Sequence, residues 1–231
     1  PADFVVECFP GQFRNWFYSL LAMSTMMESK APFKTLLGHA LVKDESGKDM
    51  HKSSGNTIWF DDAAEEMGAD TMRWLYASQN PEHNLFFGYQ IADEIRKNLI
   101  TLWNTYSFFI TYANLDNFNP KKYSLDNVQL TTLDRWVIAK VNQFINTSDL
   151  YYKKFELYKL MKEATILLDD ISNWYVRRNR RRFWKSENDD DKISAYLTLY
   201  HVLVTYIKIM SPVVPFIAEK IYENLVLKIF N

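Results

Sequence analysis

Residues 47–56, Gly-Lys-Asp-Met-His-Lys-Ser-Ser-Gly-Asn, place two lysines, two adjacent serines and two glycines in one short stretch. The backbone amides of such a turn and a mobile ammonium can approach a polyphosphate closely and stabilise the charge of a triphosphate under attack. Turns of Gly, Ser and Lys are also common as solvated loops. The residue types alone are therefore consistent with a phosphate-binding loop or with an ordinary exposed loop.

A second set of residues that could bind phosphate lies between residues 177 and 185. On a helix that advances about 100° per residue, five basic side chains fall within an arc of roughly 140°. They are Arg177, Arg178, Arg181, Arg182 and Lys185. Guanidinium groups bind phosphates in two-point contacts, and counterion release adds affinity for each neutralised phosphate, so this face suits an RNA backbone. The alternative interpretation is a solvated face paired with neighbouring acidic residues.

Residues 50–56 resemble the Lys-Met-Ser-Lys-Ser-x-Gly-Asn signature loop of class I aminoacyl-tRNA synthetases. Gly68-Ala69-Asp70 and Arg73 are similar to the element that follows this loop in the Ile/Val/Leu subgroup. In this family the lysine matched by Lys52 contacts the ATP phosphates while the amino-acid carboxylate attacks the α-phosphorus, a role that suits a mobile point charge. The resemblance implies three catalytic residues, Lys52, Lys48 and Ser53.

Two positions of the loop depart from the family pattern. Asp49 stands where the first lysine is expected, and a carboxylate beside a triphosphate is repulsive. Either Asp49 points away from the nucleotide, or Lys48 supplies the missing positive charge; we favour the second alternative. His51 replaces the first serine of the signature and is interpreted as a surface side chain with no catalytic part.

Residues 7–17 resemble the family segment that lines the aminoacyl-adenylate pocket, with a spacing from Glu7 to Gln12 that is one residue longer. Glu7 is then expected to accept hydrogen bonds from a ribose or an ammonium group, and Gln12, at a helix start, to face the adenylate. The resemblance implies a set of residues that bind ATP or the adenylate: Glu7, Gln12, Lys52, Gly55 and Asn56. Trp16 and Phe17 are interpreted as core residues of the helix.

Residues 173–184 resemble a signature of isoleucyl-tRNA synthetases that lies on the helices of their anticodon-binding domain. Residues 133–136 and 212–219 are similar to the opening and closing segments of the same bundle. The resemblance implies that the five basic residues named above bind tRNA(Ile). Isoleucine is indicated by this resemblance alone, because a single methylene contributes only about 1 to 3 kcal/mol in a pocket and no residue of this chain discriminates it.

The composition of the 231-residue chain, 48% hydrophobic and 16% aromatic, indicates a globular fold with a sizeable core. Buried strands are predicted at residues 3–7 and 35–42, with a helix between them. This order is typical of the end of a doubly wound sheet, which binds ligands beyond the carboxyl ends of its strands, where Glu7 and the loop 48–56 would both lie. Two parallel strands cannot cover both of their faces, so the chain is interpreted as part of a larger enzyme.

Helical periodicity predicts a bundle of long helices, 91–114, 131–148, 155–185 and 191–210. The predicted fold class is mainly α, a helical anticodon-binding bundle preceded by a small α/β remnant of a Rossmann catalytic domain. Residues 1–80 are assigned to the catalytic domain, with its loop at 48–56 and the start of the connecting helices, and residues 81–231 to the anticodon-binding domain. Asp70 is expected to cap the helix that follows it. The apolar segment 196–207 is too short to span a bilayer and is interpreted as a core helix.

The formal net charge is −1, so affinity for nucleic acid requires a local basic patch rather than overall basicity. Cys8 is the only cysteine, which excludes an internal disulfide and is consistent with a reducing cytoplasm. His39, His83 and His201 have no partners at metal-ligand spacing and are interpreted as structural, so this chain is not expected to bind a metal.

The resemblance implies a parent enzyme that activates isoleucine with ATP and Mg²⁺ and transfers it to tRNA(Ile). This chain would supply the ATP-phosphate loop and the surface for the anticodon stem. The His-Ile-Gly-His signature of the family is not in the chain, which is therefore expected to be inactive alone. The protein is also expected to be monomeric, cytoplasmic and without a membrane partner. Three alternatives stay open: a stand-alone tRNA-binding module, the same segment of a valyl- or leucyl-tRNA synthetase, and a helical scaffold whose arginines only form surface ion pairs.

Overall fold

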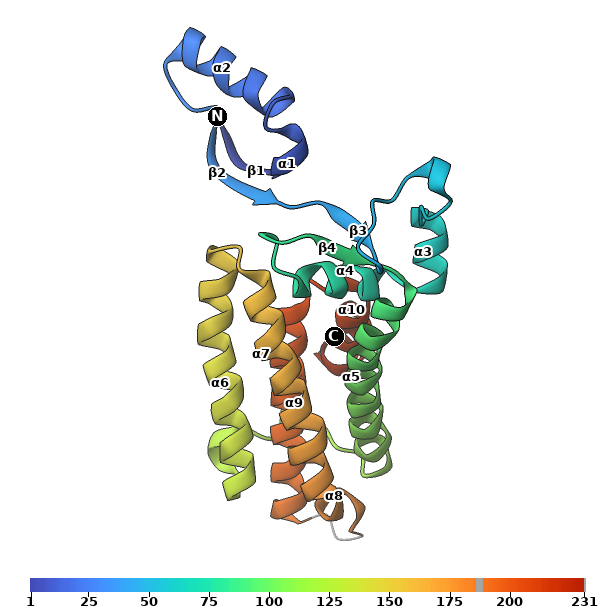
Figure 1. The fold of residues 1–231 in the computed structure, drawn as a ribbon. Helices are drawn as coiled ribbons and strands as arrows, with labels where there is room; N and C mark the ends of the chain where they lie inside the picture. The colour runs from blue at the N-terminus through green and yellow to red at the C-terminus, as the bar shows by residue number, and fades with distance from the viewer. Residues whose placement is uncertain (186–188, 231) are drawn as a thin grey trace.

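A computed structural model of the chain describes residues 1–185 and 189–230, in which an N-terminal unit of short elements stands above a bundle of long helices (Figure 1). The strands are β1 (Ala2–Cys8), β2 (Phe33–His39), β3 (Val42–Asp44) and β4 (Leu85–Phe87). The helices of the N-terminal unit are α1 (Phe9–Gln12), α2 (Trp16–Glu28), the 3-10 turn η1 (Lys52–Ser54), α3 (Phe60–Glu66) and α4 (Ala69–Ser78). The bundle comprises α5 (Tyr89–Leu115), η2 (Pro120–Lys122), η3 (Leu125–Asn127), α6 (Thr132–Lys153), α7 (Leu157–Asp169), η4 (Asp170–Val176), α8 (Arg177–Trp184), α9 (Asp190–Met210), α10 (Pro215–Tyr222), η5 (Glu223–Leu227) and α11 (Lys228–Phe230).

Parallel pairing joins β1 to β2 and β3 to β4 in two separate two-stranded sheets. Glu7 lies opposite Gly38 near the carboxyl end of the first sheet. The single strand predicted at 35–42 is therefore split between β2 and β3. The break falls at Ala40, whose amide donates to the carbonyl of Pro81 (2.8 Å) outside both sheets. The sequence does not predict β4, because a run of three apolar residues is too short to show a strand period.

The first sheet and α2 are largely exposed. Phe4 and Val6 of β1 are 37% and 50% exposed, and Phe17 is the only residue of α2 that is buried. The prediction of a strand at 3–7 is confirmed, but the prediction that it is buried is wrong, because two strands and one helix leave much of their apolar surface uncovered. Trp16, expected in the core, is 41% exposed for the same reason.

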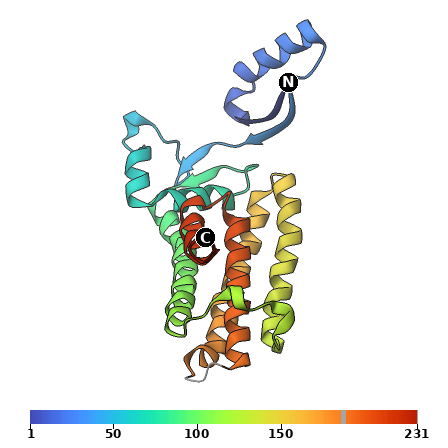
Figure 2. The same cartoon turned by 180° about the vertical axis from the view of Figure 1, so that it is seen from behind.

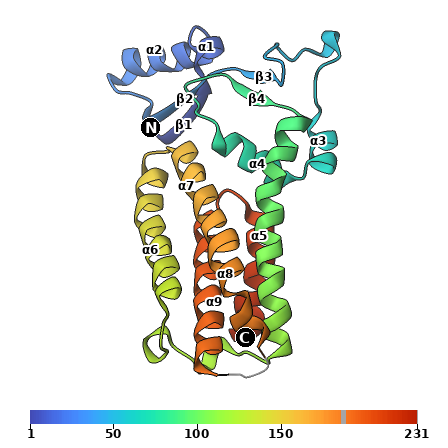
Figure 3. The ribbon, with the colours of Figure 1, turned by 60° about the horizontal axis from the view of Figure 1, so that its bottom comes forward.

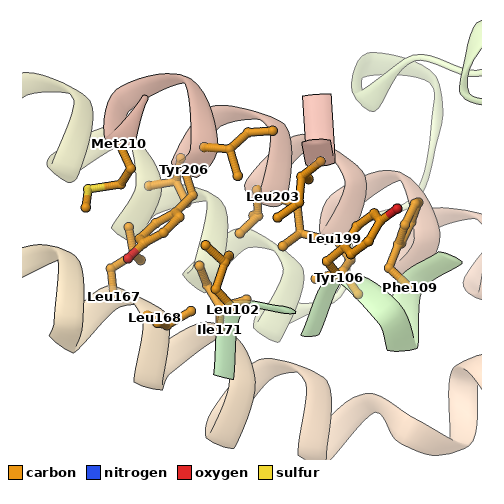
Figure 4. Close-up of a cluster of buried hydrophobic side chains, with 14 of the residues drawn as sticks. Leu102, Tyr106, Phe109, Leu167, Leu168, Ile171, Leu199, Leu203, Tyr206 and Met210 are labelled. Carbon is orange, nitrogen blue, oxygen red and sulfur yellow. The ribbon is translucent and has the colours of Figure 1, made fainter. Parts of the chain in front are cut away.

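The predicted helical bundle is confirmed, with α5, α6, α7 and α9 running up and down beside one another (Figure 1). Its core is a continuous cluster of apolar side chains to which α5, α6, α7, η4, α8, α9 and α10 contribute. Figure 4 shows the part of this cluster that lies between α5, α7, η4 and α9. Labelled members of the cluster are Leu102, Tyr106, Phe109, Leu167, Leu168, Ile171, Leu199, Leu203, Tyr206 and Met210. The hydroxyl of Tyr206 donates to the carbonyl of Ala164 (3.1 Å), so its burial leaves no polar group unpaired. Each large apolar side chain buried in this way contributes roughly 1.5–3 kcal/mol to folding.

Side-chain caps start two helices of the bundle. Thr131 Oγ1 accepts from the amide of Asp134 (3.3 Å), and a carboxylate oxygen of Asp134 accepts from the amide of Thr131 (2.8 Å), which is a capping box at α6. Asp189 accepts from the amide of Lys192 (2.9 Å) at the start of α9. The segment 116–131, with η2 and η3, crosses the outside of α9 on its way from α5 to α6 (Figure 2).

By length and composition alone, the 21-residue helix α9 is apolar enough to cross a membrane. It is the one helix among residues 1–185 and 189–230 that meets this test, and 61% of its most apolar window is buried inside the molecule. The apolar segment 196–207 lies within α9, whose bounds are close to those of the predicted helix 191–210. Its interpretation as a core helix is confirmed, because Leu199, Val202 and Leu203 are fully buried.

The sequence predicts one helix over 155–185, and α7, η4 and α8 together form a continuous helical rod over residues 157–184. Its middle part, η4, is a π-helix, a form that is rare and concentrated at functional sites. Ile171 and Tyr175 of η4 are fully buried. The π-helical part is therefore packed into the bundle core, while α8 continues to the end of the bundle (Figure 1).

Asp70 caps a helix other than the one predicted. Gly68 precedes α4 with a φ of +85°, which favours glycine. The carboxylate of Asp70, in the first turn of α4, accepts from the amides of Phe216 (3.3 Å) and Ile217 (2.7 Å). The prediction that Asp70 caps its own helix is therefore wrong, because its side chain satisfies the amides at the start of α10, distant in sequence but adjacent in space.

Arg73, one turn further along α4, contacts the other side of the same corner. Its guanidinium donates to the carbonyls of Pro212 (2.7 Å) and Val213 (2.8 Å), which follow the C-terminal end of α9. We refer to the contacts of Asp70 and Arg73 with the α9–α10 turn as the α4 clamp. The clamp joins residues of the assigned catalytic part to residues of the assigned bundle, and the domain boundary at residue 80 stays a prediction.

Candidate functional site

The signature loop follows β3 and leads to α3, at the edge of the N-terminal unit (Figure 3). Its central turn is η1, and Gly55 ends this turn with a φ of +69°, a left-handed conformation that favours glycine. The amide of Gly55 donates to the carbonyl of Lys52 (3.3 Å). Lys52 and Ser53 are exposed at the tip of the loop. The structure therefore presents the side chains of Lys52 and Ser53, two of the three predicted catalytic residues, to solvent.

The ammonium of Lys52 lies 4.8 Å from the ring centroid of Trp59, a cation–π contact with a tryptophan that is 53% exposed. Within the described part of the chain, Lys52 forms no ion pair. An exposed cation–π contact contributes only about 0.5–1 kcal/mol. Lys52 can thus leave Trp59 at small cost when a stronger anionic partner such as a triphosphate is present.

The carboxylate of Asp49 is paired with Lys43, whose Nζ lies 2.5 Å from Asp49 Oδ1. The hydrogen bond from Lys43 and the charge of its ammonium hold the pKa of Asp49 below its ordinary value. Asp49 is thus an anion paired with a lysine at the base of the loop, and both alternatives for its position relative to the nucleotide stay predictions. Lys48 is exposed and has no ion-pair partner among the described residues, and its compensating role stays a prediction.

Glu7 and Gln12 lie on the other side of the N-terminal unit. Glu7 is half-buried, and its Oε1 accepts from the amide of Cys8 (2.7 Å). Gln12 is also half-buried, but it ends α1 rather than starting a helix, because the next helix begins at Trp16. In the part of the chain that the structure describes, no hydrogen bond or ion pair joins either residue to the loop 44–56. Their contacts with ATP or the adenylate stay predictions.

The basic helix α8 lies at the end of the bundle that is far from the signature loop (Figures 1 and 3). Arg177, Arg178 and Arg181 are exposed. The guanidinium of Arg178 lies 4.4 Å from the ring centroid of Trp174, which is 47% exposed. These three arginines are therefore in a position to contact a large polyanion.

Arg182 points into the bundle instead of joining an exposed stripe. It donates to both carboxylate oxygens of Asp134, at 2.8 and 2.9 Å, and to Ser194 Oγ at 2.7 Å. The hydroxyl of Tyr175 donates to the same carboxylate at 2.6 Å. Only 12% of the Arg182 side chain is exposed, and that of Asp134 is fully buried. The prediction of a five-residue exposed stripe is therefore wrong for Arg182, because a buried carboxylate from α6 requires its charge.

Lys185 is also engaged within the chain. Its Nζ lies 2.6 Å from a carboxylate oxygen of Asp189 and 3.0 Å from one of Asp191. The alternative interpretation of the basic run, in which its residues pair with neighbouring acidic residues, therefore applies to Lys185. Binding of tRNA by Arg182 and Lys185 would require these ion pairs to open, and the binding role of all five predicted residues stays a prediction.

Two aromatic residues and one arginine on the exposed face of α8 and η4 are not among the site residues predicted from the sequence. Trp184 is 53% exposed, and the guanidinium of Arg180 lies 5.9 Å from its ring centroid. Trp174 pairs with Arg178 in the same way. The signal was present in the sequence as tryptophans placed four residues from arginines, a spacing that brings side chains together on a helix. We call the set of Trp174, Arg177, Arg178, Arg180, Arg181 and Trp184 the basic-aromatic face.

The histidines contribute no metal centre. His201 is half-buried, and burial lowers its pKa. Among residues 1–185 and 189–230, no group of three or more His, Cys, Asp or Glu side chains is arranged to hold a metal ion.

Comparisons with protein families agree with both candidate regions. The family model described as tRNA synthetases class I (I, L, M and V) matches residues 1–86. The model described as anticodon-binding domain of tRNA ligase matches residues 134–230. The fold and the two regions therefore define a segment of a class I aminoacyl-tRNA synthetase.

Within this class, the chain belongs to the isoleucine-tRNA ligase family. It is 42% identical over 98% of its length to isoleucine-tRNA ligase of Dehalococcoides mccartyi and 43% identical over 99% to that of Clostridium novyi. Each match covers 22% of the relative, so the chain spans about one fifth of the length of these curated relatives.

Solved structures of more distant proteins share the fold. Mycobacterium tuberculosis methionyl-tRNA synthetase, solved in complex with methionyl-adenylate, matches 96% of this chain with a TM-score of 0.78 and 21% identity over 44% of its own chain. A LeuRS from Agrobacterium radiobacter K84, in a ternary complex with tRNA and LeuAMS, matches 97% of this chain with a TM-score of 0.70 and 13% identity over 27% of its own chain. These likenesses confirm the predicted fold class.

Proposed function

We propose that the protein to which this chain belongs activates isoleucine with ATP and transfers it to tRNA(Ile). The observation that carries the proposal is an exposed signature loop on a chain that is 42% identical to isoleucine-tRNA ligases. In this proposal the chain supplies the ATP-phosphate loop from its first 80 residues and the anticodon-stem surface from residues 81–231. Magnesium accompanies ATP, and the chain offers no ligand set of its own among the described residues.

The loop supports the activation step through charge. The isoleucine carboxylate attacks the α-phosphorus of ATP, isoleucyl-adenylate forms and pyrophosphate leaves, so negative charge accumulates on the departing oxygens. Lys52, held by a weak contact with Trp59, can follow this charge, and the Ser53 hydroxyl can donate a hydrogen bond to a phosphate oxygen. Lys48 is a second exposed cation of the same loop and can supply the charge that Asp49 does not.

The basic-aromatic face supports tRNA binding at the other end of the molecule. Its arginines are exposed, and guanidinium groups contact phosphates through paired donors. Base stacking on an exposed tryptophan contributes about 1–3 kcal/mol per base. Arg182 and Lys185 support the face indirectly, because their ion pairs hold α8 against α6 and the start of α9.

The test of the proposal is isoleucine-dependent exchange between ATP and pyrophosphate by the complete protein. We expect exchange with isoleucine, slower exchange with valine, little with leucine, and none by residues 1–231 alone. A complete protein that prefers valine or leucine would assign the chain to another member of the subgroup. Exchange by the isolated chain would show that the subsites for adenine and isoleucine lie within it. We further propose a monomeric, cytoplasmic enzyme.

A stand-alone tRNA-binding module is the second candidate, favoured by the exposure of the basic-aromatic face independently of the loop. Under this alternative the chain binds tRNA, and the slope of the logarithm of the binding constant against the logarithm of the salt concentration is about −0.9 per neutralised phosphate. Replacing Arg177 and Arg181 by Ala should then reduce the slope, whereas replacing the remote Lys34 should not. A complete protein that binds tRNA but lacks amino-acid-dependent exchange would favour this alternative.

A further inference from the structure

We propose that Asp44 and Asn56 are positioning residues that close the base of the signature loop, so that its catalytic side chains are presented in one arrangement to ATP. This inference rests on the proposed function and adds to it. It also changes the expected role of Asn56, which the family resemblance places in contact with ATP. We refer to the contact between Asp44 and Asn56 as the loop latch.

Asp44 is the centre of the latch. One of its carboxylate oxygens accepts from the amides of Ser46 (2.9 Å) and Lys48 (2.8 Å) and from Ser46 Oγ (2.8 Å). Its other oxygen accepts from Asn56 Nδ2 (2.9 Å). The hydrogen bond from Asn56 and those from Lys48 and Ser46 lower the pKa of Asp44 to about 2, so the carboxylate is charged in the range where the enzyme would work.

Asn56 completes the latch from the opposite end of the loop. Its Nδ2 donates to Asp44 and to the carbonyl of Asp49 (2.9 Å), and its Oδ1 accepts from the amide of His51 (3.0 Å). Both amide hydrogens of Asn56 are therefore used within the loop. A side chain in this state holds the loop together and has no donor left for a phosphate oxygen.

The latch leaves the chemical groups of the loop accessible. Lys48, Lys52, Ser53 and Ser54 lie between the two latched residues and are exposed, and their side chains make no hydrogen bond within the described residues. Polar contacts thus gather at the base of the loop, while the side chains that could bind phosphate are at its tip. This division is expected of a catalytic loop whose shape is fixed at its base, because misplacing a catalytic group by about 1 Å can lower the rate roughly a hundredfold.

The experiment exchanges the two latch residues in the complete protein. Asp44→Asn alone turns an amide donor toward the donor of Asn56, and Asn56→Asp alone brings two carboxylates together. The double variant D44N/N56D restores one donor and one acceptor across the latch. Asp61→Asn is the matched control, because it removes an exposed charge at the start of α3, just beyond the loop, and Asp61 takes no part in the latch.

Two measurements are made on each variant, the rate and ATP KM of isoleucine-dependent pyrophosphate exchange and the rate of tryptic cleavage after Lys48 and Lys52. We expect each single latch variant to lower kcat by about a hundredfold with a smaller effect on KM, and to speed cleavage. The double variant should recover at least about tenfold of the loss in kcat, a non-additivity expected of residues in contact. The control should stay within about threefold of the wild type.

Single variants with unchanged kcat, or a double variant whose loss equals the product of the two single losses, would overturn the inference. A loss that appears in ATP KM alone would return Asn56 to the role of an ATP contact. A wild-type protein without isoleucine-dependent exchange would instead overturn the proposed function and, with it, the catalytic role of the latch. The cleavage rates would then decide only whether the latch holds the loop.

Discussion

Within residues 1–185 and 189–230, the side chain of Lys52 is held by one weak contact, and this freedom suits the catalytic role that we propose for it. Its cation–π contact with Trp59 keeps the ammonium near the loop without the strength of an ion pair. We predict that Lys52→Ala lowers kcat for pyrophosphate exchange by about 10²–10³-fold, the usual loss for a group that stabilises transition-state charge. Lys48→Ala should give a loss of similar size if Lys48 replaces the missing signature lysine. The comparison uses steady-state exchange kinetics, and a full-rate K52A enzyme would contradict the assignment.

Arg178 and Arg182, one helical turn apart, show what sequence spacing can and cannot predict about a site. The spacing correctly places basic residues on one side of a helix, and the motif correctly indicates the family. It does not predict that Asp134, on another helix, carries a buried charge that withdraws Arg182 from the surface. Nor does it predict that Asn56 uses both amide hydrogens within its own loop. The first effect depends on a contact between helices that are distant in sequence, and the second depends on the closed shape of the loop. Neither is contained in the spacing of the residues.

The junction of α6, α8 and α9 depends on the ion pair between Arg182 and Asp134. We predict that Arg182→Met destabilises the protein by about 3–5 kcal/mol, because it leaves a buried carboxylate without its positive partner. The exposed neighbour provides the control, since Arg181→Met should change stability by no more than about 0.5 kcal/mol. Urea unfolding followed by circular dichroism measures both values. Equal stabilities of the two variants would show that the buried pair is not a source of stability.

The same junction predicts a dependence of stability on pH. Burial alone would raise the pKa of Asp134, but hydrogen bonds from Arg182 and Tyr175 outweigh it and place this pKa below its ordinary value. A lowered pKa in the folded state means that the contribution of Asp134 is complete above its unfolded pKa of about 3.9 and is lost as the pH falls through the folded value. We expect the stability of the wild type to fall more steeply than that of Asp134→Asn below about pH 4. Parallel urea-unfolding curves of the two proteins against pH would contradict this expectation.

Elements with a long apolar period are predictable from the sequence, whereas short elements and those that depend on a distant partner are not. The helices of the bundle follow from periodicity because each buries its own stripe against a common core. The strand β4 and the split of 35–42 depend on pairing between segments that lie far apart in the sequence. The capping role of Asp70 likewise depends on α10, which begins at Pro215. Partners of this kind appear only when the whole chain is folded.

In the whole molecule, the two candidate regions lie at opposite ends of the bundle, and the α4 clamp joins the end that carries the loop to the rest (Figure 1). The carboxylate of Asp70 accepts from amides at the start of α10, and the guanidinium of Arg73 donates to carbonyls just after α9. These two side chains of α4 therefore hold the α9–α10 turn from both sides. Glu45 adds a further link, since its carboxylate accepts from the amide of Ile91 (2.9 Å) at the start of α5. The loop is therefore anchored to helices that run toward the basic-aromatic face.

This arrangement predicts that the clamp matters most for the step that uses tRNA. In the proposed function, activation uses ATP, isoleucine and the catalytic domain with its loop, whereas transfer also uses a tRNA that is bound near α8 and placed with its acceptor end at the adenylate. We expect Asp70→Ala with Arg73→Met, in the complete protein, to leave pyrophosphate exchange within about threefold and to lower kcat/KM for tRNA by at least about tenfold, as misplacement of a bound substrate does. Trp59→Phe, outside the clamp, is the control and should leave the ratio of the two rates unchanged. Equal losses in exchange and transfer would show that the clamp supports folding of the N-terminal unit rather than its alignment with the bundle.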